Sequence, residues 1–156
     1  MSHTTKQPYR EIFLRGIISG FIAGAIKDLF ATVLVWRKVI HNHFWNYAAI
    51  LAFNQPPHSW GMTWFAVILE LFFSTLVGYL YCLLLPALKT RHPLIQGTYY
   101  GCFVWFLIRC IVLTFSIREL FPTHAGDVII FFFLSALDGF IIALINYRLM
   151  KDDERI

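Results

Sequence analysis

The stretch GIISGFIAGAIKDL, residues 16–29, decides the fold of this chain. One face of the helix that it predicts carries four residues on neighbouring turns: Gly16, Gly20, Gly24 and Asp28. Small residues on such a face let a second helix approach closely within a bilayer. A charge in the hydrocarbon costs roughly 2.5–3.5 kcal/mol on insertion scales, so Lys27 and Asp28 need partners or water. The stretch therefore predicts a membrane helix in a tight bundle with a polar interior.

Composition extends this prediction to the whole chain. Hydrophobic residues make up 58% of the 156 residues and charged residues 14%, whereas a soluble domain carries about 25% charged residues. A membrane span needs about 20 mostly apolar residues, and four segments meet that length: 12–36, 63–85, 94–117 and 127–147. They leave no room for a soluble domain. We therefore expect an all-α, integral membrane four-helix bundle, with residues 1–156 forming a single transmembrane domain.

The basic residues outside the spans predict the orientation of the chain. Four spans place the N-terminus, the 86–93 loop and the C-terminus on one side. That side carries seven basic residues: Lys6, Arg10, Lys89, Arg91, Arg148, Lys151 and Arg155. The opposite side carries three: Arg37, Lys38 and Arg118. Because cytoplasmic loops are enriched in Lys and Arg, we expect a multi-pass membrane protein with both termini in the cytoplasm.

The other spans also combine small residues with a charge, and the second and third do so on the same four-residue spacing. The second span carries Ala66, Glu70, Ser74, Gly78 and Cys82. The third carries Gly97, Gly101, Trp105 and Arg109, and the fourth carries Ser135, Asp138, Gly139 and Asn146. The residues expected to pack the helices are Gly16, Gly20, Gly24, Ser74, Gly78, Gly97, Gly101 and Gly139. The remaining positions are mostly Phe, Leu, Val and Ile, which suits contact with lipid.

The charges of the four spans are expected to meet in one layer. Measured from the middle of each span at about 1.5 Å per residue, they lie at similar depths. The expected intramembrane charged network is Lys27, Asp28, Glu70, Arg109 and Asp138, with a formal sum of −1. The guanidinium of Arg109 can bridge two carboxylates because it presents a planar fork of donors.

Two interpretations of this network remain open. A structural network would fix which helix faces point inward. An ion or proton site would use a carboxylate that changes its charge, with Glu70 or Asp138 as the candidate. Against transport, four spans make a narrow bundle, and the sequence contains no clear inverted repeat or pair of broken helices.

The long connection between the first two spans predicts a further helix. Residues 44–53 are too few to span the bilayer but suffice for a short interfacial helix in the first outer loop. The sequence Asn54-Gln55-Pro56-Pro57 ends it, because proline lacks a donor and restricts the residue before it. Alternatively, the segment covers the polar layer as a lid.

Histidines in the same connection raise the question of a metal. His41, His43 and His58 are the candidate ligands, with His124 in the other outer loop, and imidazoles suit zinc or copper. No acid or cysteine stands nearby in the sequence to complete a usual site, so we expect no bound metal. A glycine-rich phosphate loop and the HExxH, CxxC and GxSxG motifs are also missing from the sequence. We therefore expect no catalytic residues, no cofactor and no enzymatic activity.

Three short motifs are similar to those of a known group of proteins. They are Ile26-Lys27-Asp28-Leu29, Gly97-x-x-Tyr100-Gly101-x-x-x-Trp105 and Asp138-Gly139. With these motifs and its layout, the chain resembles small, uncharacterised four-span bacterial membrane proteins of the YqhR and YagU kind. The resemblance implies a bacterial cytoplasmic-membrane protein and supplies no catalytic residues.

The sequence leads to two expectations about function. The first is a small, non-enzymatic accessory protein that binds a membrane-protein partner or forms a homo-oligomer within the lipid bilayer. The alternative is a translocator of an ion, a proton or a small solute that uses the intramembrane carboxylates and Arg109. A nucleic-acid partner is not expected, because the basic residues behind the pI of about 9.1 lie where anionic headgroups would attract them.

Overall fold

The computed structural model describes residues 9–88, 92–114 and 124–153, and these residues form five helices and no strand. The four long helices are α1 (Tyr9–Trp36), α3 (Trp60–Leu88), α4 (Pro93–Thr114) and α5 (Ala125–Asp153). The short helix is α2 (Phe44–Phe53). All four long helices are long and apolar enough to cross a membrane. The prediction of an all-α, four-helix bundle is confirmed.

The helix boundaries follow the sequence signals closely. The bounds of α2 agree with the predicted segment, and Asn54 ends it in the left-handed conformation while its N–H donates to the carbonyl of Ile50 over 2.8 Å. α1, α3 and α5 begin two or three residues before the predicted spans, and α5 continues to Asp153, past the predicted end at 147. Several residues used above lie outside the described residues: 115–117 of the third predicted span, Lys6, Lys89, Arg91, Arg118 and Arg155.

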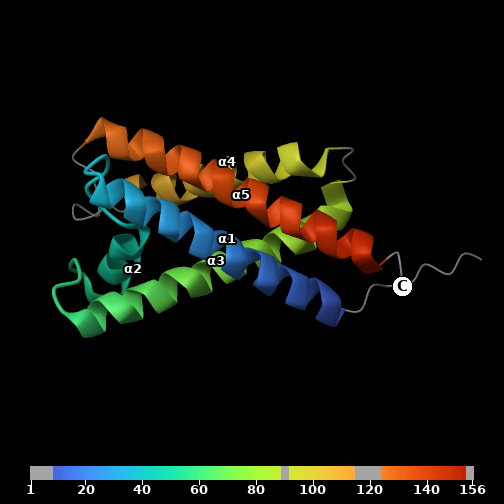
Figure 1. The fold of residues 1–156 in the computed structure, drawn as a ribbon, viewed down its shortest axis with the longest axis horizontal. Helices are drawn as coiled ribbons and strands as arrows, with labels where there is room; N and C mark the ends of the chain where they lie inside the picture. The colour runs from blue at the N-terminus through green and yellow to red at the C-terminus, as the bar shows by residue number, and fades with distance from the viewer. Residues whose placement is uncertain (1–8, 89–91, 115–123, 154–156) are drawn as a thin grey trace, which may run out of the picture.

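The four long helices run in alternating directions (Figure 1). α1 and α4 share one direction, and α3 and α5 share the other. The beginning of α1 and the end of α5 therefore lie at the same end of the bundle, and α2 lies at the opposite end, between α1 and α3. α1 packs mainly on α3, α4 packs mainly on α5, and α1 and α5 join the two pairs, whereas α3 and α4 barely touch.

Glycines allow the two helices of each pair to approach each other closely. A Cβ atom at Gly20 would overlap the carbonyl oxygen of Ser74, and one at Gly78 would overlap that of Gly16. In the second pair, a Cβ atom at Gly101 would overlap the carbonyl oxygen of Ser135, and one at Gly139 would overlap that of Gly97. The backbones of these helices are therefore in contact, as small-residue packing in membranes allows.

The two pairs are built alike. Gly16 and Gly20 of α1 correspond to Gly97 and Gly101 of α4, and Ser74 and Gly78 of α3 correspond to Ser135 and Gly139 of α5. Because α1 and α4 point the same way, the repeat is parallel (Figure 1). The sequence shows no clear inverted repeat, and the repeat in the structure is a parallel one. The same alignment matches Asp28 with Arg109, so equivalent positions carry opposite charges.

Replacing Gly101 by alanine is expected to destabilise the bundle by about 1–3 kcal/mol, the usual cost of overpacking. The added Cβ atom would meet backbone atoms of α5, which cannot move aside as a flexible side chain can. Gly126→Ala is the matched control, because a Cβ atom there has no neighbour within 4 Å. Unfolding in mixed detergent micelles measures the free energy of unfolding of both variants. Equal stability of the two variants would show that α4 and α5 are not in backbone contact.

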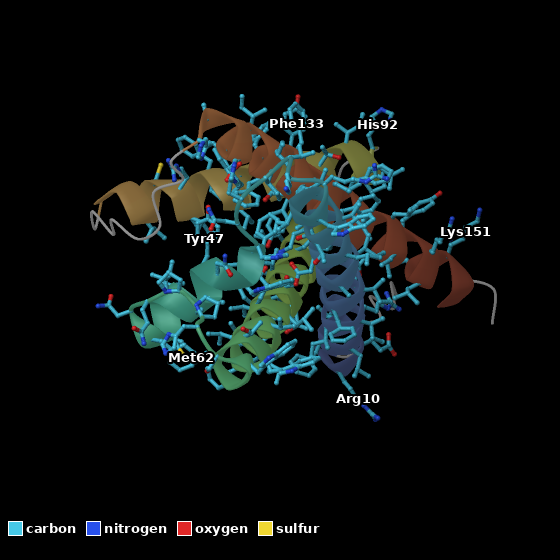
Figure 2. The ribbon with its side chains drawn as sticks, turned by 60° about the vertical axis from the view of Figure 1, so that its left-hand side comes forward. Arg10, Tyr47, Met62, His92, Phe133 and Lys151 are labelled. Carbon is cyan, nitrogen blue, oxygen red and sulfur yellow. The ribbon has the colours of Figure 1, made fainter. Side chains whose placement is uncertain are left out.

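Apolar side chains divide between the interior and the outer surface as expected for a membrane protein. Ala23, Val77 and Ile142 are buried where α1, α3 and α5 meet. Large side chains such as Phe72 and Phe133 are about two-thirds exposed, at 65% and 64%, and Figure 2 shows Phe133 pointing away from the bundle. These exposed faces are suited to contact with acyl chains.

Candidate functional site: a charged cavity between the helix pairs

A cavity of about 480 Å³ lies between the two helix pairs, with α2 as part of its wall. Its charged lining residues are Lys27, Glu70, Arg109 and Asp138. Ser74 and Ser135 also line it, and most other lining residues are apolar, among them Phe44, Val104 and Phe131. The space exists because α3 and α4 barely touch while α1 and α5 hold the pairs together. We call this space the charged cavity.

An ion pair between α1 and α3 forms one side of the charged cavity. The Nζ atom of Lys27 lies 2.5 Å from the Oε1 atom of Glu70 and 3.4 Å from the Oγ atom of Ser74. Lys27 is 5% exposed and Glu70 is 7% exposed, so the pair is shielded from solvent. The ring of Phe44 in α2 also lies 4.5 Å from the Nζ atom, which adds a cation–π contact.

Two further carboxylates are buried beside this pair. Asp138 of α5 lines the charged cavity and is 8% exposed, and Asp28 of α1 is 7% exposed. Both carboxylate oxygens of Asp28 and the Oδ1 atom of Asp138 lack a hydrogen-bond partner among the described residues. Buried polar atoms are normally paired. These oxygens therefore mark a place where a proton, a cation or water would be bound favourably.

The structure brings the predicted charged residues together. Glu70, Arg109 and Asp138 come from three different helices and line one cavity with Lys27, and Asp28 is the neighbour of Lys27 in the sequence. Arg109 is half-buried. The cation that pairs with Glu70 is Lys27, and the bridging of two carboxylates by Arg109 stays a prediction.

α2 covers the charged cavity at one end of the bundle. Its residues Ala48, Ala49 and Ile50 are buried, and Phe44, Tyr47 and Leu51 line the cavity. The phenol ring of Tyr47 lies against Phe131 of α5, with ring centroids 5.6 Å apart, and Figure 2 places Tyr47 on α2. Burial raises the pKa of Tyr47 to about 12, so its phenol stays neutral at physiological pH. Of the two roles considered for this segment, these contacts favour the lid.

A second buried polar cluster lies nearer the other end of the bundle, and the sequence did not single it out. The amide nitrogen of Asn146 donates to the Oγ atom of Ser19 over 2.8 Å, and the Sγ atom of Cys82 donates to the amide oxygen of Asn146 over 2.9 Å. It ties α1, α3 and α5 together. Asn146 had been noted on its helix face, but only the packing shows that Ser19 and Cys82 meet it. Cys82, Cys102 and Cys110 form no disulfide bond.

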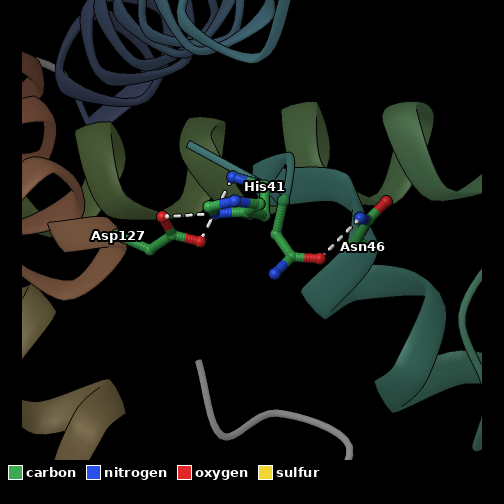
Figure 3. Close-up of polar contacts among 4 residues, drawn as sticks. His41, Asn46 and Asp127 are labelled. Atoms are coloured by element: carbon green, nitrogen blue, oxygen red, sulfur yellow. Dashed lines mark hydrogen bonds and ion pairs between the residues drawn. The ribbon is translucent and has the colours of Figure 1, made fainter. Parts of the chain in front are cut away.

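The histidines lie outside the charged cavity and separate into different surroundings. His41 contacts Asp127 through both its backbone N–H and its Nδ1 atom, each at 3.2 Å (Figure 3). The ring of His124 stacks on that of His41 with centroids 4.1 Å apart. His43 instead stacks on Trp45 at 3.9 Å, and burial lowers its pKa.

Two expectations about the histidines need correction. The expectation that no acid stands near them was wrong, because Asp127 is brought to His41 by the fold. The grouping of His41 with His43 and His58 was also wrong: the cluster of potential ligands that the structure describes consists of His41, His124 and Asp127. The sequence could have revealed part of this cluster, because Asp127 lies only three residues after His124, whereas the separation of 86 between His41 and Asp127 concealed the rest.

Comparison with known proteins does not assign this chain to a family. No family model, curated protein or solved structure matches this chain. The resemblance to proteins of the YqhR and YagU kind therefore stays a prediction, and the roles of the residues rest on the geometry described above.

Proposed function

We propose that this membrane protein moves a small cation, the proton included, across the bilayer, with the charged cavity as the binding site. The observation that carries the proposal is Asp138, a buried carboxylate at the edge of a cavity with an oxygen that no described residue pairs. The charged network has two cations, Lys27 and Arg109, and three carboxylates. Its formal charge is therefore −1. An excess of negative charge favours a cation over an anion.

Unpaired buried oxygens support a functional site over a purely structural network. A network that only specified helix packing would be expected to satisfy its buried polar atoms, since each unpaired one costs about 1–3 kcal/mol. Asp28 and Asp138 leave three carboxylate oxygens without a hydrogen-bond partner among the described residues. In a transporter, such oxygens exchange protons or cations during the cycle.

The architecture offers a way to alternate access to the cavity. α2 covers one end of it. Toward the other end, the hydroxyl of Tyr100 donates to the carbonyl of Val77 over 2.8 Å, which links α4 to α3. The two helix pairs are joined mainly through α1 and α5. Rocking of one pair against the other about that contact would open one end of the cavity while the other stays closed.

Flux measurements in proteoliposomes test this proposal. The purified chain is reconstituted, and the movement of protons, Na⁺ and K⁺ is followed after a gradient of each is imposed. We expect transport of at least one of these cations clearly above that of protein-free vesicles. Rates equal to those of protein-free vesicles for all three cations would contradict the proposal.

An accessory role, with a membrane-protein partner or a homo-oligomer, is the other function that we expected from the sequence, and it stays a prediction. Native mass spectrometry of gently extracted protein tests it. A defined second chain or a fixed oligomer in the spectrum would support an accessory role. A monomer that carries only lipid would count against it.

A further inference from the structure

A cluster of three metal-ligating side chains lies at the α2 end of the bundle, apart from the charged cavity. His41 belongs to the connection between α1 and α2, His124 directly precedes α5, and Asp127 lies in the first turn of α5. One ligand atom from each lies within 4.8 Å of the other two. None of these residues lines the charged cavity. We call them the histidine–aspartate cluster.

Local backbone structure positions His41. After α1 ends at Trp36, the N–H of Lys38 donates to the carbonyl of Val35 and that of Val39 to the carbonyl of Leu34, each over 2.9 Å. This is a Schellman motif, with Lys38 at a φ of 59°. The chain thus reverses, and Ile40, only 1% exposed, packs against Phe131 and Leu134 of α5. His41 follows directly and is held beside the beginning of α5.

Asp127 is the fixed member of the cluster. It is 1% exposed, and its two carboxylate oxygens contact the backbone N–H and the Nδ1 atom of His41. Its own N–H donates to the carbonyl of His124 over 3.1 Å, which holds the two residues on one turn. A buried carboxylate at this position has its orientation set by the fold, whereas the two imidazoles are exposed and can turn.

The distances suit a shared metal ion. The Nδ1 atom of His41 and the Oδ1 atom of Asp127 are 3.2 Å apart, longer than the roughly 2.7–2.9 Å of a charge-assisted hydrogen bond. Two ligand atoms of a tetrahedral zinc ion lie about 3.3 Å apart, given metal–ligand distances of about 2.0–2.2 Å. The ring of His124 stacks on that of His41 with centroids 4.1 Å apart, and its ligand nitrogen lies within 4.8 Å of the other two ligand atoms.

We propose that His41, His124 and Asp127 bind a divalent transition metal of the zinc class. Two imidazoles and one carboxylate are a usual ligand set for zinc, and three protein ligands leave a fourth position for water or another ligand. The bound ion links the α1–α2 connection to the beginning of α5. This site is independent of the cation proposed for the charged cavity, and its occupancy is measured without any flux assay.

Metal content of the full-length protein tests the proposal. The protein is purified in mild detergent, equilibrated with Zn²⁺, freed of loose metal by a weak chelator and analysed for zinc. We expect about one zinc ion per chain in the unsubstituted protein. His41→Ala and His124→Ala are each expected to weaken binding at least about 100-fold, beyond the roughly 10–100-fold that loss of a merely orienting residue costs.

Matched controls come from the same protein. His43→Ala and His58→Ala remove histidines that are not part of the cluster, and both are expected to keep full zinc binding. Cobalt replacement gives a second readout: visible absorption typical of a four-coordinate site is expected, and Asp127→Asn is expected to abolish it. Circular dichroism checks that each variant is folded. An unsubstituted protein without zinc, or zinc that stays in folded His41→Ala and His124→Ala, would overturn the proposal.

Discussion

Replacing Asp138 by asparagine is expected to reduce cation flux in proteoliposomes to the level of protein-free vesicles while the protein stays folded. Asparagine keeps the shape of aspartate but cannot take up or release a proton, and it removes one charge from the cavity. The five charged residues would then sum to zero. Because Oδ1 of Asp138 has no hydrogen-bond partner among the described residues, its replacement breaks no hydrogen bond at that atom.

Glu11→Gln is the matched control for this experiment. Glu11 is a carboxylate in the first turn of α1, half-exposed at 49%, and its partner Arg15 lies 3.6 Å away. It lies outside the charged cavity, so its variant is expected to transport at the unsubstituted rate. Size-exclusion chromatography and circular dichroism confirm folding of both variants. Full flux in folded Asp138→Asn would refute the role of this carboxylate and favour a structural network.

Breaking the Lys27–Glu70 pair is expected to have the largest effect on stability. Glu70→Ala leaves the ammonium group of Lys27, which is 5% exposed, without its partner at 2.5 Å. Removal of one member of a buried ion pair typically costs about 3–5 kcal/mol. Unfolding in mixed detergent micelles is expected to show a loss of this size. The Glu11–Arg15 pair gives the comparison: Glu11 is 49% exposed, so Glu11→Ala should cost less than about 1 kcal/mol.

A double variant measures the interaction between Lys27 and Glu70 separately from the effect of each single substitution. Lys27→Met with Glu70→Leu replaces both charges by apolar groups of similar size, which is often neutral for stability. We expect it to be more stable than Glu70→Ala, with a coupling energy of about 0.5–3 kcal/mol between the two positions. Strictly additive effects of the two substitutions would mean that Lys27 and Glu70 do not interact in the membrane.

The fold could be predicted from sequence because its signals are local. Four apolar runs of sufficient length and the prolines after Phe53 predicted the number of helices and the bounds of α2. Four-residue spacing placed Gly20 and Gly101 on packed faces, which the backbone contacts confirm. The same spacing turned Glu70 inward, and Asp138, beside Ser135 and Gly139, was expected in the same charged layer; both residues are buried.

The partners of these residues could not be predicted, because they depend on which helices pack together. Lys27 lies in a stretch whose small residues suggested packing, but its pairing with Glu70 depends on the crossing of α1 and α3. The parallel repeat became visible only when the same backbone contacts were found in both helix pairs. Asp127 meets His41 because the turn after α1 ends beside α5, and no spacing in the sequence encodes that distance.

The central claim is that a polar solute can reach the charged cavity inside the membrane, and thiol accessibility tests it most directly. In a variant whose native cysteines, Cys82, Cys102 and Cys110, are replaced by serine, single cysteines are introduced at Ser135 and at Phe133 of α5. Ser135 lines the cavity, whereas Phe133, two residues away, points outward and is 64% exposed. A small, positively charged methanethiosulfonate reagent is then applied to the reconstituted protein. We expect rapid modification of Ser135→Cys and little modification of Phe133→Cys. Modification of Ser135→Cys no faster than that of Phe133→Cys would contradict it.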